Sequence, residues 1–207
     1  MGFFQLENER IDRNKPPTEL LHQKGCSLCT LDRESRYLKN AKMPASGAAK
    51  PLIYILGEFP TKQDDELGRQ FSGASGALLR EHIPKQYLDV IRWNNTVNCA
   101  PKEEKSPSNL ELECCRPRQI SDIEKSQPEA IFGFGGVPLT WADRSNTFAW
   151  RGRRFPIKIG NHTCWYYAFH HPAFLLHLRK ENDGRASNYE LAFKIDVKRA
   201  LQQVSAG

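Results

Sequence analysis

Residues 51–79 read PLIYILGEFPTKQDDELGRQFSGASGALL, and this stretch carries the main signal for the fold. The apolar run Pro51–Leu56 predicts a buried strand, which Gly57 ends. The glycines and the proline that follow predict a tight loop close to a ligand, with a helix from about Gly76. The loop has neither the GxxxxGKS/T nor the GxGxxG pattern, so a nucleoside triphosphate site of these kinds is not expected.

Further strand-like runs follow at 90–97, 130–134 and 164–169, and helical stretches alternate with them. Ser108 and Glu111 have the spacing of a capping box, as do Ser187 and Glu190 before an amphipathic helix expected over 187–204. This order favours an α/β sheet that is at least partly parallel. We expect a single-domain α/β/α sandwich over residues 1–207, with a central, mostly parallel four-stranded sheet.

The composition of the chain excludes some classes of protein but does not identify a function. The chain has 207 residues, 39% of them hydrophobic, and no apolar run approaches the roughly 18 residues of a membrane span. Met1–Arg10 lacks the pattern of a secretory signal, so a cytoplasmic location is expected. The net charge of +6 suits a polyanionic partner, although many basic proteins have none.

The cysteines suggest metal chemistry. Cys26 and Cys29 form a CxxC pair, and Cys99 and Cys115 stand alone farther along the chain. A zinc ribbon normally has a second close pair, so one CxxC with separate cysteines suits an iron–sulfur cluster better. Two free thiols near a turn are the alternative for the CxxC. Cys114 lies beside Cys115 and points in a different direction on a helix, and Cys164 is expected in the core.

Several motifs occur together in an order that resembles one known family. They are GEFPT at 57–61, DD at 64–65, GRQFSG at 68–73, NTVNCAP at 95–101, Glu111 with Cys115-Arg116-Pro117, FGFG at 132–135 and HPAFLLH at 171–177. This set resembles the uracil-DNA glycosylase superfamily, most closely its iron–sulfur-containing family 4. The family's corresponding motifs include GEAPG, G-x-P-F-x-G, NVVKCRPP and HPSYLLR. The resemblance runs from about Cys26 to His177.

The resemblance implies an enzyme that flips deoxyuridine out of single- or double-stranded DNA, hydrolyses its N-glycosidic bond and leaves an abasic site. It also implies a structural 4Fe-4S cluster. The implied ligands are Cys26, Cys29, Cys99 and Cys115. A monomer that acts on DNA is expected, with replication or repair proteins as candidate further partners.

The same resemblance implies roles for the residues of the pocket. Phe71 would stack on the base, Asn95 would pair with O4 and N3–H of uracil, and His171 would donate to the charge that develops on O2. From the residues alone, a core phenylalanine, a turn asparagine and a structural His-Pro pair remain open. Glu58 would organise the site, and Asp64 would lie near C5 of uracil.

Contacts with the rest of the DNA are expected from the last motif and from basic residues. Leu175 or Leu176 would be the apolar wedge that fills the gap left by the flipped base. Arg153 is a candidate for phosphate contacts, although a solvated surface position is equally consistent with the sequence.

The chain departs from the family pattern inside the pocket loop. Phe59 replaces a small residue and is expected to line the substrate site, and Thr61 replaces a glycine. A phenyl ring offers no acid–base capacity and would crowd the pocket. The alternative function is therefore a catalytically weak or inactive DNA-binding module associated with replication or repair proteins. The FSGASG segment also resembles the broader-specificity family 5, but family 4 matches better.

Overall fold

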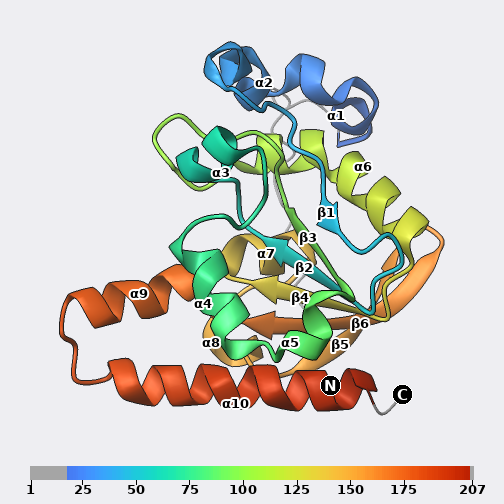
Figure 1. Cartoon of the computed structure of the whole chain (residues 1–207). Coiled ribbons are helices and arrows are strands. Elements are labelled where there is room, and N and C mark those ends of the chain that lie inside the picture. The colour runs from blue at the N-terminus through green and yellow to red at the C-terminus, as the bar shows by residue number, and fades with distance from the viewer. Residues whose placement is uncertain (1–17, 206–207) are drawn as a thin grey trace, which may run out of the picture.

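The computed structural model describes residues 18–205, so the sequence reading of Met1–Arg10 lies outside the described residues. One six-stranded sheet in the order β1-β3-β2-β4-β6-β5 forms the centre, and helices pack on both of its faces (Figure 1). The strands are β1 (Ser46–Gly47), β2 (Ile53–Gly57), β3 (Ile91–Asn95), β4 (Ala130–Phe134), β5 (Arg154–Ile159) and β6 (His162–Phe169). The expected α/β class is confirmed.

The expectation of four strands is wrong, because the sheet has six. The four predicted strands are its parallel centre, β3-β2-β4-β6, and the two missed strands pair antiparallel at the edges. β1 has only two residues and lies in a polar loop. β5 contains Pro156 and has an interrupted burial pattern, which is typical of an edge strand and gives no continuous apolar run.

Helices connect the strands and cover them. They are α1 (Thr18–Lys24), η1 (Gly25–Leu28), α2 (Thr30–Glu34), η2 (Ser35–Tyr37), α3 (Lys62–Leu67), α4 (Ala74–His82), α5 (Lys85–Leu88), α6 (Asn109–Ser126), α7 (Gly136–Trp141), α8 (Thr147–Trp150), α9 (Pro172–Lys180) and α10 (Ala186–Ser205). No helix within residues 18–205 combines the length and the apolar character needed to cross a bilayer.

The two capping-box predictions have different outcomes. At the start of α6, Ser108 accepts from the Glu111 backbone N–H, and the Glu111 carboxylate accepts from the Ser108 N–H at 2.7 Å, as predicted. The last helix, α10, begins one residue before Ser187, so Ser187 lies inside its first turn. Asp183 instead accepts from the Arg185 backbone N–H at 2.8 Å just before the helix.

Alternate residues of β2 divide the interior into two layers. Ile53 and Ile55 face one core with residues of α4 and α10, and Tyr54 and Leu56 face another with residues of α6 and α7. All five residues of the strand are buried. Because β3, β2, β4 and β6 are parallel, their carboxyl ends meet at one edge of the sheet, where α/β proteins bind ligands.

The close packing of β4 against β6 gives a stability prediction. A Cβ added to Gly133 would lie 1.8 Å from the Tyr166 hydroxyl and 2.3 Å from its ring carbon Cζ. Tyr166 is fully buried and cannot move aside freely. We expect Gly133→Ala to lower the free energy of unfolding by about 1–3 kcal/mol, measured by urea denaturation.

The matched control for this substitution is Gly136→Ala. A Cβ there would meet only the Thr147 hydroxyl, at 3.7 Å, and Gly136 is already helical in α7. The control should unfold at a urea concentration equal to or above that of the wild type. Equal stability of the two variants would contradict the packing described for Gly133.

Candidate active site

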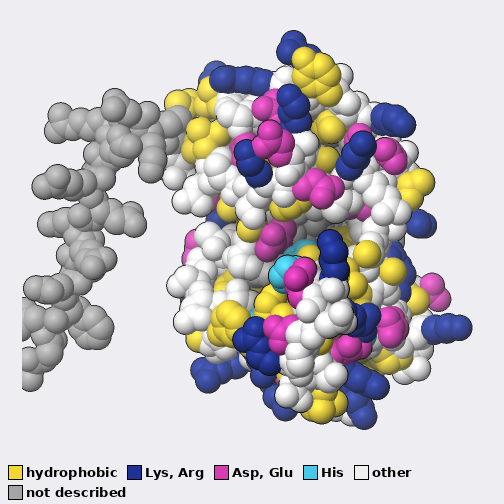
Figure 2. All heavy atoms as spheres, turned by 90° about the vertical axis from the view of Figure 1, so that its left-hand side faces the viewer, with side chains coloured by type: hydrophobic (Ala, Val, Ile, Leu, Met, Phe, Trp, Pro, Cys, Tyr) yellow, Lys and Arg dark blue, Asp and Glu magenta, His cyan; other side chains and the backbone are white. Residues whose placement is uncertain are grey.

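A pocket of about 330 Å³ opens at the carboxyl edge of the parallel strands. Figure 2 looks onto this end of the molecule and shows a histidine side chain in a hollow, with acidic and basic side chains around it. Five residues predicted from the sequence line the pocket: Phe59, Asp64, Phe71, Asn95 and His171. The remaining lining residues are Thr61, Gln63, Gly73, Ala74, Ser75, Gly76, Glu104 and Ala173.

Phe71 is held in an uncommon backbone conformation at the pocket wall. Its φ of 56° lies in the left-handed region, which is rare for an aromatic residue. Arg80 donates to the Phe71 carbonyl at 2.7 Å, and the next residue, Ser72, donates its N–H to Asp64 at 2.6 Å. A Cβ on Gly76 would lie 1.9 Å from the same carbonyl, so α4 can approach only through a glycine.

Gly57 allows the Phe71 ring and the Asn95 amide to meet at the end of β2. A Cβ on Gly57 would lie 2.3 Å from the Asn95 Oδ1 and 2.5 Å from the Phe71 Cζ. Any other residue would displace one of these two groups. The glycine that ends the first predicted strand therefore sets the position of both an aromatic face and an amide in the pocket.

Asp64 uses its carboxylate to organise the pocket loop. It accepts from the Thr61 N–H at 2.9 Å and from the Ser72 N–H at 2.6 Å, and it is only 3% exposed. The Thr61 hydroxyl accepts in return from the Asp64 N–H at 3.2 Å. These contacts form the capping box that begins α3. Thr61, a departure from the family motif, is thus the N-cap of this helix.

Glu58 connects the end of β2 with the start of α7. Burial raises its pKa, and the neighbouring backbone N–H groups of Val137 and Gly136 offset part of this shift. Gly135 has a φ of +107°, and a Cβ there would lie 2.3 Å from the Glu58 Oε1. Glu58 lies beside the pocket and is not among its lining residues. The organising role that the family resemblance implies for Glu58 stays a prediction.

His171 faces the pocket with a defined tautomer. Its Nδ1 accepts from the Ala173 N–H at 3.1 Å, which makes His171 the N-cap of α9. A neutral ring that accepts at Nδ1 carries its proton on Nε2 and can donate from there. Burial lowers the pKa of His171 to about 4, so the ring is neutral at physiological pH.

The neighbouring His170 packs away from the pocket, among aromatic rings. Its ring centroid lies 4.8 Å from that of Phe148, 5.5 Å from Phe174 and 5.9 Å from Tyr189. It does not line the pocket, in agreement with the sequence expectation that His170 and His171 point to different faces.

The structure separates the two wedge candidates. Leu175 is 1% exposed and belongs to the main core, so it does not reach the surface, whereas Leu176 is partly buried against that core. Sequence reasoning missed Phe148 in α8, which is 65% exposed beside His170. Its context, NTFAW, has no feature that distinguishes an exposed aromatic from a buried one. Arg153, the predicted phosphate contact, is exposed just before β5.

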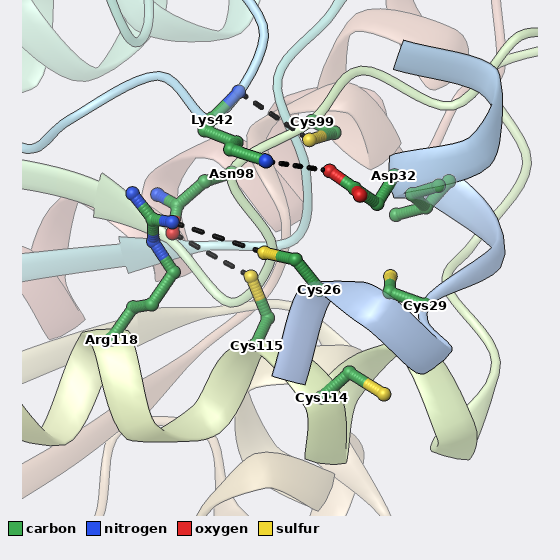
Figure 3. A pocket seen from close by; sticks show the side chains of 10 residues that line it. Cys26, Cys29, Asp32, Lys42, Asn98, Cys99, Cys114, Cys115 and Arg118 are labelled. Carbon is green, nitrogen blue, oxygen red and sulfur yellow. Dashed lines mark hydrogen bonds and ion pairs between the residues drawn. The ribbon is translucent and has the colours of Figure 1, made fainter. Parts of the chain in front are cut away.

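Five cysteines line one small cavity between the N-terminal helices and α6 (Figure 3). They include the predicted ligands Cys26, Cys29, Cys99 and Cys115. Cys114 lines the same cavity. Proximity alone therefore does not exclude Cys114 as a ligand.

Polar groups surround the sulfur atoms. The Lys42 N–H donates to the Cys99 Sγ at 3.4 Å, and an Arg118 Nη donates to the Cys26 Sγ at 3.9 Å. Hydrogen bonds to sulfur tune thiolates in iron–sulfur centres. Within residues 18–205, no set of three or more His, Cys, Asp or Glu side chains is arranged to hold a single metal ion. Thiolates are the ligands that iron–sulfur clusters use, so the chemistry of these donors is compatible with a cluster.

Comparisons with known proteins agree with these observations. The model of the uracil DNA glycosylase superfamily matches residues 44–194. A type-4 uracil-DNA glycosylase of Pyrobaculum aerophilum is 37% identical over 56% of the chain, and the match spans 59% of that relative. The type-4 enzymes of Sulfurisphaera tokodaii and Saccharolobus solfataricus are 28% and 27% identical over 74% and 82% of the chain, with 72% and 83% of their own lengths covered. The chain therefore belongs to the uracil DNA glycosylase superfamily.

Proposed function

We propose that this protein is a uracil-DNA glycosylase, which hydrolyses the N-glycosidic bond of a flipped deoxyuridine in DNA and leaves an abasic site. The observation that carries the proposal is the convergence of an aromatic ring, an amide and a histidine N–H donor on one pocket, from Phe71, Asn95 and His171. The names of the type-4 relatives support the same activity.

Base recognition would use the first two of these groups. The Phe71 ring offers a flat apolar surface on which an extruded base can stack. The Asn95 amide can donate to O4 of uracil and accept from its N3–H, whereas cytosine presents a donor and an acceptor in the opposite places. Asp64 lies on the same pocket, with both carboxylate oxygens bound to backbone N–H groups.

Bond cleavage would depend on charge stabilisation. As the bond between C1′ and N1 breaks, its electron pair moves into the uracil ring and negative charge develops on O2. The His171 Nε2–H would donate to this oxygen. The nearby negative charge of Asp64 favours a cation-like sugar. A water then adds its oxygen to C1′, and the proton it releases neutralises the departing uracil anion. Phe59 takes no part in proton transfer, and would act only by shaping the pocket wall.

The surface around the pocket would contact the DNA backbone and the neighbouring bases. Exposed Arg153 is our candidate for a phosphate contact, and the partly buried Leu176 and the exposed Phe148 are candidates for the apolar wedge. We also propose that the chain acts as a monomeric, single-domain repair enzyme inside the cell.

A 4Fe-4S cluster bound by Cys26, Cys29, Cys99 and Cys115 completes the proposal. It would fasten η1, the residue between η1 and α2, and the loop after β3 to α6, because these segments supply the four thiols. When bound, such a cluster supplies iron–thiolate bonds that take the place of a larger apolar core in this region.

The activity is tested with a DNA oligonucleotide that contains one uracil, followed by alkali to break the strand at abasic sites. We expect cleavage by the wild type, and at least about a hundredfold slower excision by Asn95→Ala and by His171→Ala, because each loses a hydrogen bond to the departing base. Both single- and double-stranded substrates should be used.

Arg185→Ala is the control, because Arg185 is exposed and its ion pair is with Asp183, beside α10. It should cleave at the wild-type rate. If the wild type binds the oligonucleotide but yields no strand breaks, the protein is a binding module and the glycosylase proposal is wrong.

The lowered pKa of His171 predicts a pH-dependent stability. The unfolded chain takes up a proton near the ordinary histidine pKa of 6.5, but the folded chain does so only near 4, so this contribution is complete above 6.5 and is lost as the pH falls toward 4. From pH 7 to pH 5, we expect the wild type to lose about 1 kcal/mol more unfolding free energy than His171→Asn, measured with urea.

His171→Asn is chosen because asparagine can also accept from the Ala173 N–H at the N-cap, but it does not titrate. The remaining histidines are the same in both proteins and cancel in the comparison. A stability difference that stays constant between pH 7 and pH 5 would show that His171 titrates normally in the folded protein.

The choice of cluster ligands is tested at the two adjacent cysteines. Cys115→Ala should abolish the broad visible absorbance near roughly 400 nm that is expected of thiolate-bound iron–sulfur centres, and should reduce the iron content. Cys114→Ala should retain both. The reverse result would assign the fourth ligand to Cys114, and a colourless wild type that contains zinc would contradict the cluster.

A further inference from the structure

Gln70 is a fully buried residue beside the pocket, and its amide orientation is fixed by acceptors that cannot be donors. Its Nε2 donates to the main-chain carbonyls of Met43 and Pro44 at 3.2 and 3.4 Å, and to the Asn94 Oδ1 at 3.1 Å. A carbonyl only accepts, so the nitrogen end of Gln70 must face these groups. Its oxygen end then faces Asn95.

The oxygen of Gln70 in turn determines the orientation of the Asn95 amide. The Asn95 Nδ2 donates to the Gln70 Oε1. If the Asn95 amide were flipped, its oxygen would face the oxygen of Gln70, and two acceptors would be in contact within a buried site. One N–H of Asn95 is thus used by Gln70, and the second N–H and the Oδ1 remain for a ligand.

The orientation of Asn94 is fixed independently, at the other end of the same chain of hydrogen bonds. Its Oδ1 accepts from the backbone N–H of Asn95 at 2.9 Å, a group that can only donate. Its Nδ2 donates to the Tyr54 hydroxyl at 2.7 Å, which in turn donates to Asp122 at 2.8 Å. Arg92 holds that carboxylate at 2.6 Å. In the series of hydrogen bonds from Arg92 to Asn95, each donor and acceptor can therefore be assigned in only one way.

We propose that Gln70 is a positioning residue that locks the Asn95 amide in the orientation that pairs with uracil and rejects cytosine. The inference rests on the proposed function, because it concerns the choice of base in the same pocket. In the locked orientation, Asn95 offers a donor where uracil has O4 and an acceptor where uracil has N3–H. A freely turning amide could reverse these positions and accept from the amino group of cytosine.

Comparison with the family motif indicates that this contact between Gln70 and Asn95 is particular to this chain. The motif G-x-P-F-x-G quoted above has a proline at the place of Gln70, and proline has no side-chain amide that could hold Asn95. Gln70 therefore acts through Asn95 and needs no contact with the base itself.

The experiment compares Gln70→Met, Gln70→Glu and the wild type on oligonucleotides that carry a single uracil or a single cytosine. Methionine keeps the size of the side chain and offers no comparable acceptor, so the ratio of uracil to cytosine excision should fall by about tenfold or more. The second oxygen of glutamate would face the Met43 and Pro44 carbonyls, so the buried side chain should be protonated and donate there. It then keeps an acceptor oxygen toward Asn95 and should retain the wild-type ratio, even where its overall rate is lower.

Ile131→Val is the control for general destabilisation. Ile131 is fully buried in β4, in the core on the other face of the sheet from Phe71. It should lose some stability and keep the wild-type ratio. If Gln70→Met keeps the wild-type ratio while the wild type excises uracil, the inference is wrong and the proposed function stands.

A second measurement does not depend on catalysis. In the wild type, NMR should show a side-chain N–H of Asn95 that is protected from hydrogen exchange, with its signal assigned by loss in Asn95→Ala. Protection should persist in Gln70→Glu and fall by about tenfold or more in Gln70→Met, since only methionine removes the acceptor. If the Asn95 side-chain N–H is equally protected in Gln70→Met and in the wild type, the proposed role of Gln70 is wrong. This result holds even if the wild type is inactive and the proposed function fails.

Discussion

The pocket depends on the missing Cβ of Gly57. At this point the Phe71 ring and the Asn95 amide both approach the end of β2 more closely than a side chain would allow. Phe71 reaches the site only through a left-handed backbone conformation, which is costly for an aromatic residue and persists because Arg80 and Asp64 hold the residues around it. The strained backbone of Phe71 and the missing side chain of Gly57 together allow a flat ring and an amide to lie side by side.

The acidic residues of the motif loop are largely engaged in building that loop. Glu58 lies against Gly135 at the start of α7, Asp64 completes the capping box of α3 with Thr61, and Asp65 accepts from the backbone N–H groups of Lys39 and Asn40 at 3.0 and 2.7 Å. Their charges remain beside the pocket, although their oxygen atoms are occupied. In the proposed reaction, these carboxylates would therefore act by electrostatic stabilisation of a cation-like sugar and not by proton transfer.

The strands with continuous apolar runs could be predicted from the sequence. The features that depend on tertiary packing could not. The strand before Gly57 and the strand at 130–134 are buried on both faces, so their composition reveals them. The edge strand with Pro156 and the two-residue strand at Ser46 have no such signal. The sequence also did not show that Leu175 is buried and Phe148 exposed, because their burial depends on how α8, α9 and α10 pack together. The importance of Gln70 arises from two carbonyl groups about 26 residues away in the chain, which no local motif could indicate.

The cysteine-lined cavity and the pocket are parts of one hydrogen-bonded network. Asn98 donates to the Met43 carbonyl at 2.8 Å and to the Asn94 Oδ1 at 2.9 Å, and its own Oδ1 accepts from the Cys115 thiol at 3.6 Å. Met43 is in turn held by the Asn98 carbonyl, and the preceding Lys42 N–H contacts Cys99. A metal-bound Cys115 thiolate has no proton to donate to Asn98, but the Lys42 N–H can still donate to the Cys99 sulfur. Binding at the cysteines would therefore steady the Met43 carbonyl, which orients Gln70, through the neighbouring Lys42. A structural cluster in this position would act on base recognition without contacting the base.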